Sequence, residues 1–546
     1  MSAWQVREAG DSALLLELEP VIDARVNGIA IAAAAAIRRE APAGVLDVLP
    51  TYRSVAVYFD PLDVDAGAVR AVIERAAGAP ASESSGALVE VPVVYGGEYG
   101  PDLDAVAAFA GVPAEEVVAR HTASEYRVFM LGFLPGFAYM GSLHPSIAAP
   151  RRASPRLRVA AGSVGIAGRQ TGVYPFDAPG GWQIVGRTPM PMFEASRAAP
   201  ARLAPGDRVR FVRADASVMA GADRREAGLG AVGAPVRPDA PPSVMVIRPG
   251  LFTTVQDEGR WGYQHGGVPV CGAMDLQSHR LANAIVGNGG RAATLEATLA
   301  GPDLRFDAPA TVAVTGADVE VTVDGAAVAM YTPVVCRAGS VLRVGARRAG
   351  GRSYIAFAGG LETTPVLGSR ATHVRTAMGG LHGLALRAGD RLPLGSPSRQ
   401  APRRRMPAPR MGTGARLRVL PGPQVDQFPP GALDRLQHGR FTVTPQSDRM
   451  GYRLAGEQAI PEAAGEMISD ATFAGGVQVP PAGDPILLMA DRQTTGGYPQ
   501  VAVVISADLP LAGQLVPGDW IEFEVCSRAA ALAALAFRRD EVRALA

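Results

Sequence analysis

The sequence contains no lysine, because all 53 of its lysine-plus-arginine positions are arginine. Without lysine, these 546 residues cannot supply any chemistry that needs a lysine amine. The excluded groups are a biotinyl-lysine, a lysine Schiff base, the lysine of a phosphate-binding P-loop and the lysine of a Ser-Ser-Lys amidase triad. A phosphate or carboxylate ligand must therefore be held by arginine, by backbone N–H groups or by a metal ion.

Cysteine is scarce, and long apolar segments are missing. Cys271, Cys336 and Cys526 lie far apart, without the spacing of a metal site or a disulfide framework, which favours a reducing cytoplasm. No stretch of about eighteen uninterrupted apolar residues occurs, and the first residues lack the basic and apolar regions of a secretion signal. We therefore expect a cytoplasmic protein that does not span a membrane.

Positive and negative charges are nearly balanced. The formal net charge is +1, and charged residues make up 19% of the chain. Such a chain has no overall field that would attract nucleic acid or a membrane surface. We therefore expect no nucleic-acid partner and no membrane partner.

Glycine and proline are abundant and spread along the chain, with 64 and 45 residues. Their distribution predicts many short strands and turns, and 546 residues exceed what one hydrophobic core can hold. The predicted fold class is mainly β, with an α+β unit at the N-terminus and internally repeated β-barrels. We expect a small α/β domain at 1–80, a barrel at 87–212, a linker at 213–243, a first β domain at 244–394 and a second barrel at 416–530.

The segment from Asp484 to Pro510 is the most informative part of the chain. Its apolar runs, 486–489 and 501–505, predict two buried strands joined by a polar hairpin loop. Loops over a rigid sheet often carry binding and catalytic groups, although a merely solvated turn is the plain alternative. The candidate catalytic residues are Asp491, Arg492, Gln493 and Tyr498.

An internal repeat supports the importance of this loop. Residues 169–175, RQTGVYP, match 492–499, RQTTGGYP, with one residue inserted. Farther on, LAPGDRVRF at 203–211 matches LVPGDWIEF at 515–523. Two motifs in the same order predict two copies of one unit with the Arg-Gln pairs on equivalent loops. The second copy has a carboxylate, Asp491, where the first has glycine.

Other segments add candidates for substrate binding. The aromatic, glycine-rich segment 129–141 is interpreted either as a pocket wall or, preferably, as barrel core. A lone loop histidine such as His144 is a candidate acid or base, but such residues more often have no catalytic role. The candidate substrate-binding residues are Arg169, Gln170, Tyr174, Arg449 and His144, and no metal ligands can be named.

Longer strings carry a family resemblance. The first half, with GFLPGFAYMG and AGSVGIAGRQTGVYPFDAPGGWQIVGRTP, resembles the B subunit of the bacterial ATP-dependent 5-oxoprolinase. The second half, with TTVQDEGRWGYQHGGVPVCGAMD, PVLGSRATHVRT, SDRMGYRL and DRQTTGGYPQVAVVISADLP, resembles the C subunit of the same enzyme. Both halves also resemble the carboxyltransferase region of urea carboxylase and the proteins once named allophanate hydrolase subunits 1 and 2. Barrels of this family are cyclophilin-like.

The resemblance implies a small-molecule substrate: a fused B–C component would activate 5-oxoproline with ATP and Mg²⁺. A separate protein like the A subunit of 5-oxoprolinase would complete ring opening to L-glutamate. Arginine forks would hold the substrate carboxylate and the phosphates, and Asp491 would bind Mg²⁺ or orient the lactam N–H. Tyr174 and Tyr498 would donate hydrogen bonds. Arg169 stands where the family suggests a smaller polar residue, so its role does not carry over.

Two alternatives stay open. The first is a biotin-dependent carboxyltransferase acting on a urea-like or amide substrate; without lysine the chain has no covalently bound biotin, and the carrier must be another chain. The second is a non-enzymatic binding protein, because the first half also resembles a kinase inhibitor of sporulation control. Allophanate hydrolysis is rejected because its amidase chemistry needs a lysine. Whether the chain forms a homo-oligomer also stays open.

Overall fold

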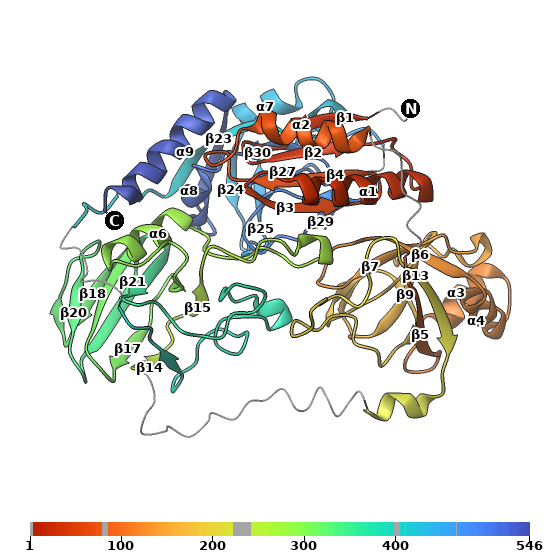
Figure 1. The fold of residues 1–546 in the computed structure, drawn as a ribbon, viewed down its shortest axis with the longest axis horizontal. Helices are drawn as coiled ribbons and strands as arrows, with labels where there is room; N and C mark the ends of the chain where they lie inside the picture. The colour runs from red at the N-terminus through yellow and green to blue at the C-terminus, as the bar shows by residue number, and fades with distance from the viewer. Residues whose placement is uncertain are drawn as a thin grey trace.

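Four units make up the chain, arranged as in Figure 1. The computed structural model describes residues 4–78, 86–221, 242–397, 405–409, 411–465 and 467–545. Most of the predicted linker at 213–243 lies outside the described residues. The architecture is mainly β, with two closed barrels of seven strands each, as the sequence predicted.

The N-terminal unit is a small sheet covered by two helices. Its strands are β1 (Gln5–Glu8), β2 (Ala13–Glu17), β3 (Val45–Pro50) and β4 (Ser54–Phe59), in the order β1-β2-β4-β3. Helices α1 (Ala24–Glu40) and α2 (Ala66–Ala77) begin after Asp23 and Asp65, whose carboxylates cap the first backbone N–H groups. The apolar faces of both helices pack on the sheet in one core.

The first barrel follows. It is built from β5 (Leu88–Tyr95), β6 (Glu125–Leu131), β7 (Ala138–Gly141), β9 (Ser163–Ala167), β10 (Gln170–Val173), β12 (Gln183–Arg187) and β13 (Arg208–Arg213). Helices α3 (Leu103–Ala110) and α4 (Ala114–Thr122) connect its first two strands, and β8 (Arg156–Val159) pairs with β11 (Ala178–Gly180) outside the barrel. Valine, leucine and aromatic side chains fill the interior.

The third unit is a nine-stranded sheet. Its long strands β18 (Ala310–Val323) and β21 (Val341–Phe357) pair over most of their length. The remaining strands are β14 (Ser243–Arg248), β15 (Phe252–Gln256), β16 (Thr294–Thr298), β17 (Asp303–Phe306), β19 (Ala326–Ala327), β20 (Val334–Cys336) and β22 (Arg391–Pro393). Helix α6 (Leu276–Ile285) covers the sheet with its buried face.

The last unit is the second barrel. Its strands are β23 (Gly414–Pro421), β24 (Arg440–Val443), β25 (Gly451–Gly456), β27 (Gly476–Gln478), β28 (Ile486–Leu488), β30 (Gln500–Val504) and β31 (Trp520–Val525). A pair outside the barrel joins β26 (Asp470–Ala471) and β29 (Thr495–Gly496). Its helices are α7 (Ala432–His438), α8 (Leu509–Gly513) and α9 (Arg528–Arg543).

The two barrels share one topology. Each strand from β5 to β13 has a counterpart from β23 to β31 in the same chain order, with the same neighbours in the barrel. Each barrel contains a single parallel pair, β5 with β13 and β23 with β31. The two Pro-Gly-Asp strings lead into the equivalent strands β13 and β31. The predicted internal repeat is therefore confirmed.

Two related predictions, the hairpin at 486–505 and the equivalence of the Arg-Gln loops, are wrong. Strands β28 and β30 are not a hairpin, because β27 pairs with both and lies between them. Residues 489–499 thus cross over a strand. The two Arg-Gln pairs are also not equivalent: Gln170 begins β10, whereas Arg492 follows β28, the counterpart of β10. Their local similarity is a coincidence within a true repeat.

The N-terminal unit packs against the second barrel, which is far from it in sequence (Figure 1). The Asp11 carboxylate accepts hydrogen bonds from the Ser506 backbone N–H at 2.8 Å and its hydroxyl at 2.6 Å. The rings of Tyr58 and Phe473 lie 5.5 Å apart. Residues of both halves therefore meet at shared interfaces.

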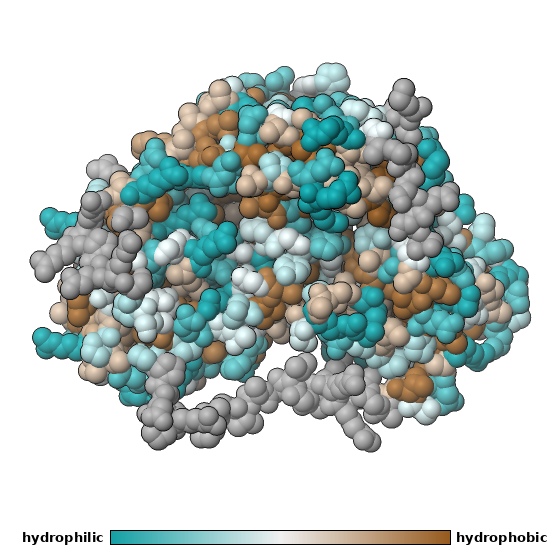
Figure 2. All heavy atoms as spheres, viewed as in Figure 1, coloured by the Kyte–Doolittle hydropathy of each residue, from teal (hydrophilic) through white to brown (hydrophobic). Residues whose placement is uncertain are grey.

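The surface shows no single hydrophobic patch on the face drawn in Figure 2, where hydrophobic areas are scattered among hydrophilic residues. None of the helices in the described part of the chain combines the length and the apolar character needed to cross a membrane.

Candidate functional site

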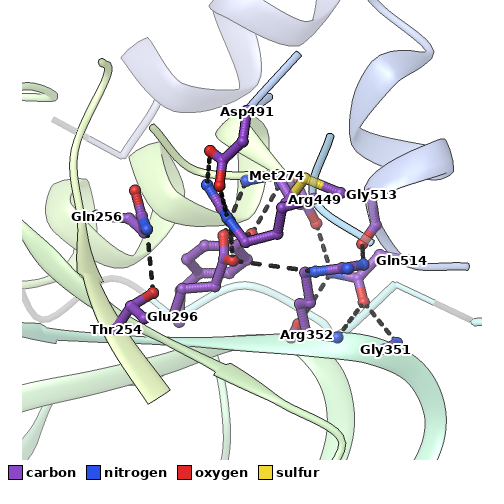
Figure 3. Close-up of polar contacts among 12 residues, drawn as sticks. Thr254, Gln256, Met274, Glu296, Gly351, Arg352, Arg449, Asp491, Gly513 and Gln514 are labelled. Atoms are coloured by element: carbon purple, nitrogen blue, oxygen red, sulfur yellow. Dashed lines mark hydrogen bonds and ion pairs between the residues drawn. The ribbon is translucent and has the colours of Figure 1, made fainter. Parts of the chain in front are cut away.

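A buried ionic network joins the third unit to the second barrel (Figure 3). Arg449 donates to both carboxylate oxygens of Asp491 at 2.9 Å and to the carbonyl oxygen of Gly272 at 2.6 Å. It also donates to the carboxylate of Glu296. The side chains of Arg449 and Asp491 are each only 11% exposed. Two carboxylates thus compensate the charge of this buried guanidinium.

Glu296 connects this pair to a second arginine. Its other oxygen accepts from the Tyr354 hydroxyl and the Met274 backbone N–H, each at 2.8 Å. Arg352 lies 3.9 Å from Glu296 and donates to the Gly513 carbonyl at 2.5 Å. The network therefore fixes the third unit and the second barrel in one relative position, and it positions Asp491.

Arg492, the next residue after Asp491, has a different environment. It is only 3% exposed, and its Nη2 atom donates to the amide oxygen of Gln264 at 3.3 Å. Among the described residues no carboxylate lies within ion-pair distance of it, and burial lowers its pKa, while the nearby Tyr58 opposes that shift. A guanidinium this deep without a carboxylate is costly unless another group compensates it.

Unsatisfied polar atoms are numerous on the segments that carry Arg492 and its partner Gln264. In the described part of the chain, eight buried side-chain atoms on the segments 256–265 and 470–495 have no hydrogen-bond partner. Buried polar groups in folded proteins are nearly always hydrogen-bonded, so such a concentration requires an explanation. The atoms are Gln256 Oε1, Arg260 Nη1, Gln264 Nε2, His265 Nδ1, Asp470 Oδ2, Arg492 Nε, Thr494 Oγ1 and Thr495 Oγ1.

Acidic side chains hold the 256–265 segment in place. Asp47 of the N-terminal unit accepts from the backbone N–H groups of Gly262 at 3.0 Å and Gln264 at 3.1 Å. Asp257 accepts from the Ser369 hydroxyl at 2.7 Å and the backbone N–H of Arg370 at 2.6 Å. The segment is therefore fixed by the N-terminal unit on one side and by the 366–371 loop on the other.

His373 belongs to the same region. Its Nδ1 atom lies 2.6 Å from the Thr376 hydroxyl, and its side chain is buried. Burial lowers the pKa of His373 to about 4, and the nearby Arg260 guanidinium acts in the same direction. The imidazole is therefore neutral at pH 7.

The first barrel reaches this region as well. A Cβ atom on Gly132 would lie 1.9 Å from Thr495 Oγ1, so backbone and side chain touch there. The amide of Gln170 donates to the Tyr52 hydroxyl at 2.5 Å, and the rings of Tyr52 and Tyr139 lie 6.1 Å apart. All four units therefore contribute to what we call the junction, meaning the 256–265 and 489–495 segments with the residues that contact them.

The structure brings only some of the predicted site residues together. Asp491, Arg492 and Arg449 lie at the junction. Half-buried Gln493 accepts from Thr472 through its carbonyl. Tyr498 is 44% exposed, and its backbone carbonyl accepts from the Gln478 amide at 3.2 Å.

The candidates of the first half are more dispersed. Arg169 is exposed in the turn before β10, whereas its neighbour Gln170 reaches Tyr52. Tyr174 is buried in an aromatic cluster with Phe137 and Trp182, and burial raises its pKa to about 12. His144 is exposed and contacts Ser146 at 2.7 Å.

Sequence reasoning noted the 256–265 segment without proposing a site there. Gln256, Arg260 and Gln264 become candidates only through their burial and their unsatisfied atoms. The available signal was the density of polar residues in QDEGRWGYQHGG between apolar strands.

The junction fits an anion better than a metal ion. Arg260 and Arg492 each leave a guanidinium nitrogen unsatisfied, which suits a carboxylate or phosphate oxygen. Asp491, expected to bind Mg²⁺, already accepts from Arg449 through both oxygens. Among the described residues no three His, Cys, Asp or Glu side chains are grouped to hold a metal ion. An Mg²⁺ ion bound here would therefore take most of its ligands from a bound nucleotide and water rather than from these side chains.

Comparison with known proteins covers both halves. Residues 4–203 match the model of the carboxyltransferase domain, subdomains C and D, and residues 266–525 match subdomains A and B. The chain is 40% identical to the C subunit of 5-oxoprolinase from Escherichia coli, over 55% of its own length and 95% of that protein. The chain belongs to the carboxyltransferase-domain family that includes the 5-oxoprolinase subunits. It is also 44% identical to the B subunit of 5-oxoprolinase from Bacillus subtilis, over 38% of its length and 92% of that protein.

Two further family members place these halves in other contexts. The crystal structure of TTHA0988 superposes with a TM-score of 0.82 at 36% identity, over 95% of this chain and 100% of that one. Urea amidolyase of Saccharomyces cerevisiae is 33% identical over 52% of this chain, but the match spans only 16% of that much longer protein. The family thus contains separate subunits, fused chains and parts of larger enzymes.

Proposed function

We propose that the chain is a fused B–C component of an ATP-dependent 5-oxoprolinase. It would activate 5-oxoproline by phosphorylation, so that the ring opens to L-glutamate with the help of a separate A-subunit-like protein. The proposal is supported by relatives named as the B and C subunits of 5-oxoprolinase, each of which this one chain covers almost completely.

The observation that carries the proposal is the shared construction of the junction. Asp47 and Tyr58 of the first half lie against the Gln264 loop and Arg492 of the second. A site built by both halves suits one substrate on which the two act together, because Asp47 of the first half holds the Gln264 loop of the second. Proximity and fixed orientation are major sources of rate enhancement.

The chemistry requires groups of the kind the junction offers. A lactam is a poor electrophile, and ATP would supply the phosphoryl group that makes its carbonyl carbon reactive toward water. The chain must hold a small carboxylate substrate, and buried guanidinium groups are suited to that task. Donors fixed in a water-poor region also stabilise developing negative charge strongly.

The test is an assay of L-glutamate formation from 5-oxoproline with the purified chain, an A-subunit-like protein and ATP with Mg²⁺. We expect product only when all components are present. ATP hydrolysis without glutamate formation, or no dependence on the chain, would reject the proposal.

A second candidate function is carboxyl transfer from biotin to a urea-like or amide substrate. It is favoured by the family description itself and by the match to urea amidolyase. Because these residues contain no lysine, biotin would have to be presented by another chain or segment. Free biotin or a biotinylated carrier domain should then stimulate carboxylation, which the oxoprolinase assay would not require. The purified chain itself should give no streptavidin-reactive band after co-expression with a biotin ligase.

A further inference from the structure

Two buried donor atoms, one on Arg492 and one on Gln264, have no hydrogen-bond acceptor. Arg492 Nε and Gln264 Nε2 are both N–H donors without a partner, in side chains that are 3% and 1% exposed. The two side chains touch, because Arg492 Nη2 donates to Gln264 Oε1 at 3.3 Å. That contact occupies the amide oxygen and leaves the amide nitrogen available. A ligand here must be an acceptor.

Charge points to the same conclusion. Arg449 pairs with Asp491 and Glu296, and Arg352 lies 3.9 Å from Glu296. Among the described residues no carboxylate lies within ion-pair distance of Arg492, which is only 3% exposed, and Asp47 acts on its charge from farther away. An uncompensated buried cation is unfavourable, and a bound anion removes that cost. The missing acceptor is therefore best supplied by an oxyanion.

We infer that Arg492 and Gln264 form an oxyanion subsite that binds the carboxylate of the substrate. This inference rests on the proposed function only for the identity of that carboxylate. The guanidinium supplies charge and a directed N–H, and the amide supplies a second N–H beside it, which is the arrangement that favours carboxylates. The lactam ring of 5-oxoproline would then extend from the subsite toward the other unsatisfied groups of the junction.

Two residues of the N-terminal unit hold the subsite in place. Asp47 fixes the Gln264 backbone N–H at 3.1 Å, and Tyr58 packs its ring 6.2 Å from that of Trp261 while donating to the Thr472 carbonyl at 2.9 Å. Both donors of the subsite thus sit on backbone segments fixed from both halves. Such support keeps a binding geometry rigid.

The experiment measures binding to the full chain by calorimetry and thermal shift with three probes. These are 5-oxoproline, 2-pyrrolidone, which has the same ring without the carboxylate, and inorganic phosphate. We expect 5-oxoproline to bind at least about tenfold more tightly than 2-pyrrolidone, which is the size expected for one charged hydrogen-bonded contact. The Arg492→Gln variant should bind 5-oxoproline and 2-pyrrolidone about equally tightly. The exposed Arg348, 3.6 Å from Glu320, gives the control Arg348→Gln, which should keep it.

A second variant covers the case in which Arg492→Gln fails to fold. Gln264→Glu keeps the shape of the side chain and places a negative charge beside the expected carboxylate. It should weaken 5-oxoproline binding by at least about tenfold and leave 2-pyrrolidone binding unchanged, since like charges at close range repel.

Several outcomes would overturn the inference. Equal binding of 5-oxoproline and 2-pyrrolidone, or a preference that survives both variants, would remove the subsite and leave its donors to water. Stabilisation by phosphate alone, lost in Arg492→Gln, would overturn the assignment to a substrate carboxylate. Arg492-dependent binding without glutamate formation would support the subsite while the proposed function fails. Unchanged glutamate formation in Arg492→Gln would overturn the subsite while the proposed function stands.

Discussion

Arg449 and Asp491, 42 residues apart in the sequence, form a two-point ion pair with both distances at 2.9 Å. The sequence predicted Asp491 on a polar loop, where its carboxylate would bind Mg²⁺ or orient the lactam N–H. In the structure both of its oxygens are engaged, and its side chain is 11% exposed. Its first effect is therefore to orient Arg449, and any effect on the substrate follows from that arrangement.

Asp491→Asn should reduce both activity and stability. The variant removes one of two carboxylates around a buried guanidinium, and breaking such a pair typically costs about 3 kcal/mol. A substitution at an exposed surface position, by contrast, would change the free energy of unfolding by only about 0.5 kcal/mol. We expect glutamate formation to fall on the order of a hundredfold, together with a lower melting temperature. Asp484→Asn, at an exposed position, is the control and should change neither.

Arg492 and Arg169 should respond differently to substitution. Arg169 is exposed in a turn, so Arg169→Ala should leave the free energy of unfolding within about 0.5 kcal/mol. Arg492→Ala should lower kcat/KM by on the order of a hundredfold, the typical loss for one charge contact in the transition state. Steady-state kinetics of both variants checks this. Equal losses would mean that the first barrel also supplies the site.

Asp47→Ala, a change in the first half, should reduce activity by loosening the Gln264 loop of the second half. Its carboxylate accepts from two backbone N–H groups of the Gln264 loop, and such charged hydrogen bonds are each worth about 2 kcal/mol. We expect kcat/KM to fall at least about tenfold. Asp65→Ala, which removes a helix cap in the same unit, is the matched control and should cost about 1 kcal/mol of stability without loss of activity.

His373 should make stability depend on pH below neutrality. Its pKa in the folded chain is about 4, against an ordinary value of 6.5 in the unfolded chain. Between these values the unfolded chain binds a proton that the folded chain does not. The free energy of unfolding is therefore unaffected by His373 above pH 6.5 and falls as the pH drops toward 4. The full loss amounts to about 3 kcal/mol. His373→Gln should show a smaller fall in melting temperature between pH 7.5 and 4.5, whereas exposed His144→Gln should behave like the parent chain.

Gly132→Ala should disturb the contact between the barrels. A Cβ atom there would lie 1.9 Å from the Thr495 hydroxyl and 2.9 Å from its Cβ atom, so the loops must separate. Overpacking of this kind costs about 1–3 kcal/mol. Adding Thr495→Gly should restore the melting temperature. Gly289→Ala, which meets nothing within 4 Å, is the control. A drop that Thr495→Gly fails to reverse would place the strain elsewhere.

Local patterns in the chain were enough to predict the strand content, the repeat and the family. Short, β-branched apolar runs such as 501–505 favour strands, and the Pro-Gly-Asp strings mark equivalent strands of two barrels. These features are local, because hydrophobic patterning and turn residues act over a few positions. The missing lysine limited the available anion-binding chemistry before any fold was known.

How these parts meet could be learned only from the packed molecule. The hairpin after Met489 failed as a prediction because β27, which comes earlier in the chain, lies between β28 and β30. The junction likewise depends on pairs such as Asp47 with Gln264 and Arg492 with Gln264, separated by 217 and 228 positions. Strand neighbours and buried polar contacts are fixed by packing across the whole molecule, where the cost of an unpaired group selects one arrangement. No local pattern in the chain carries that information.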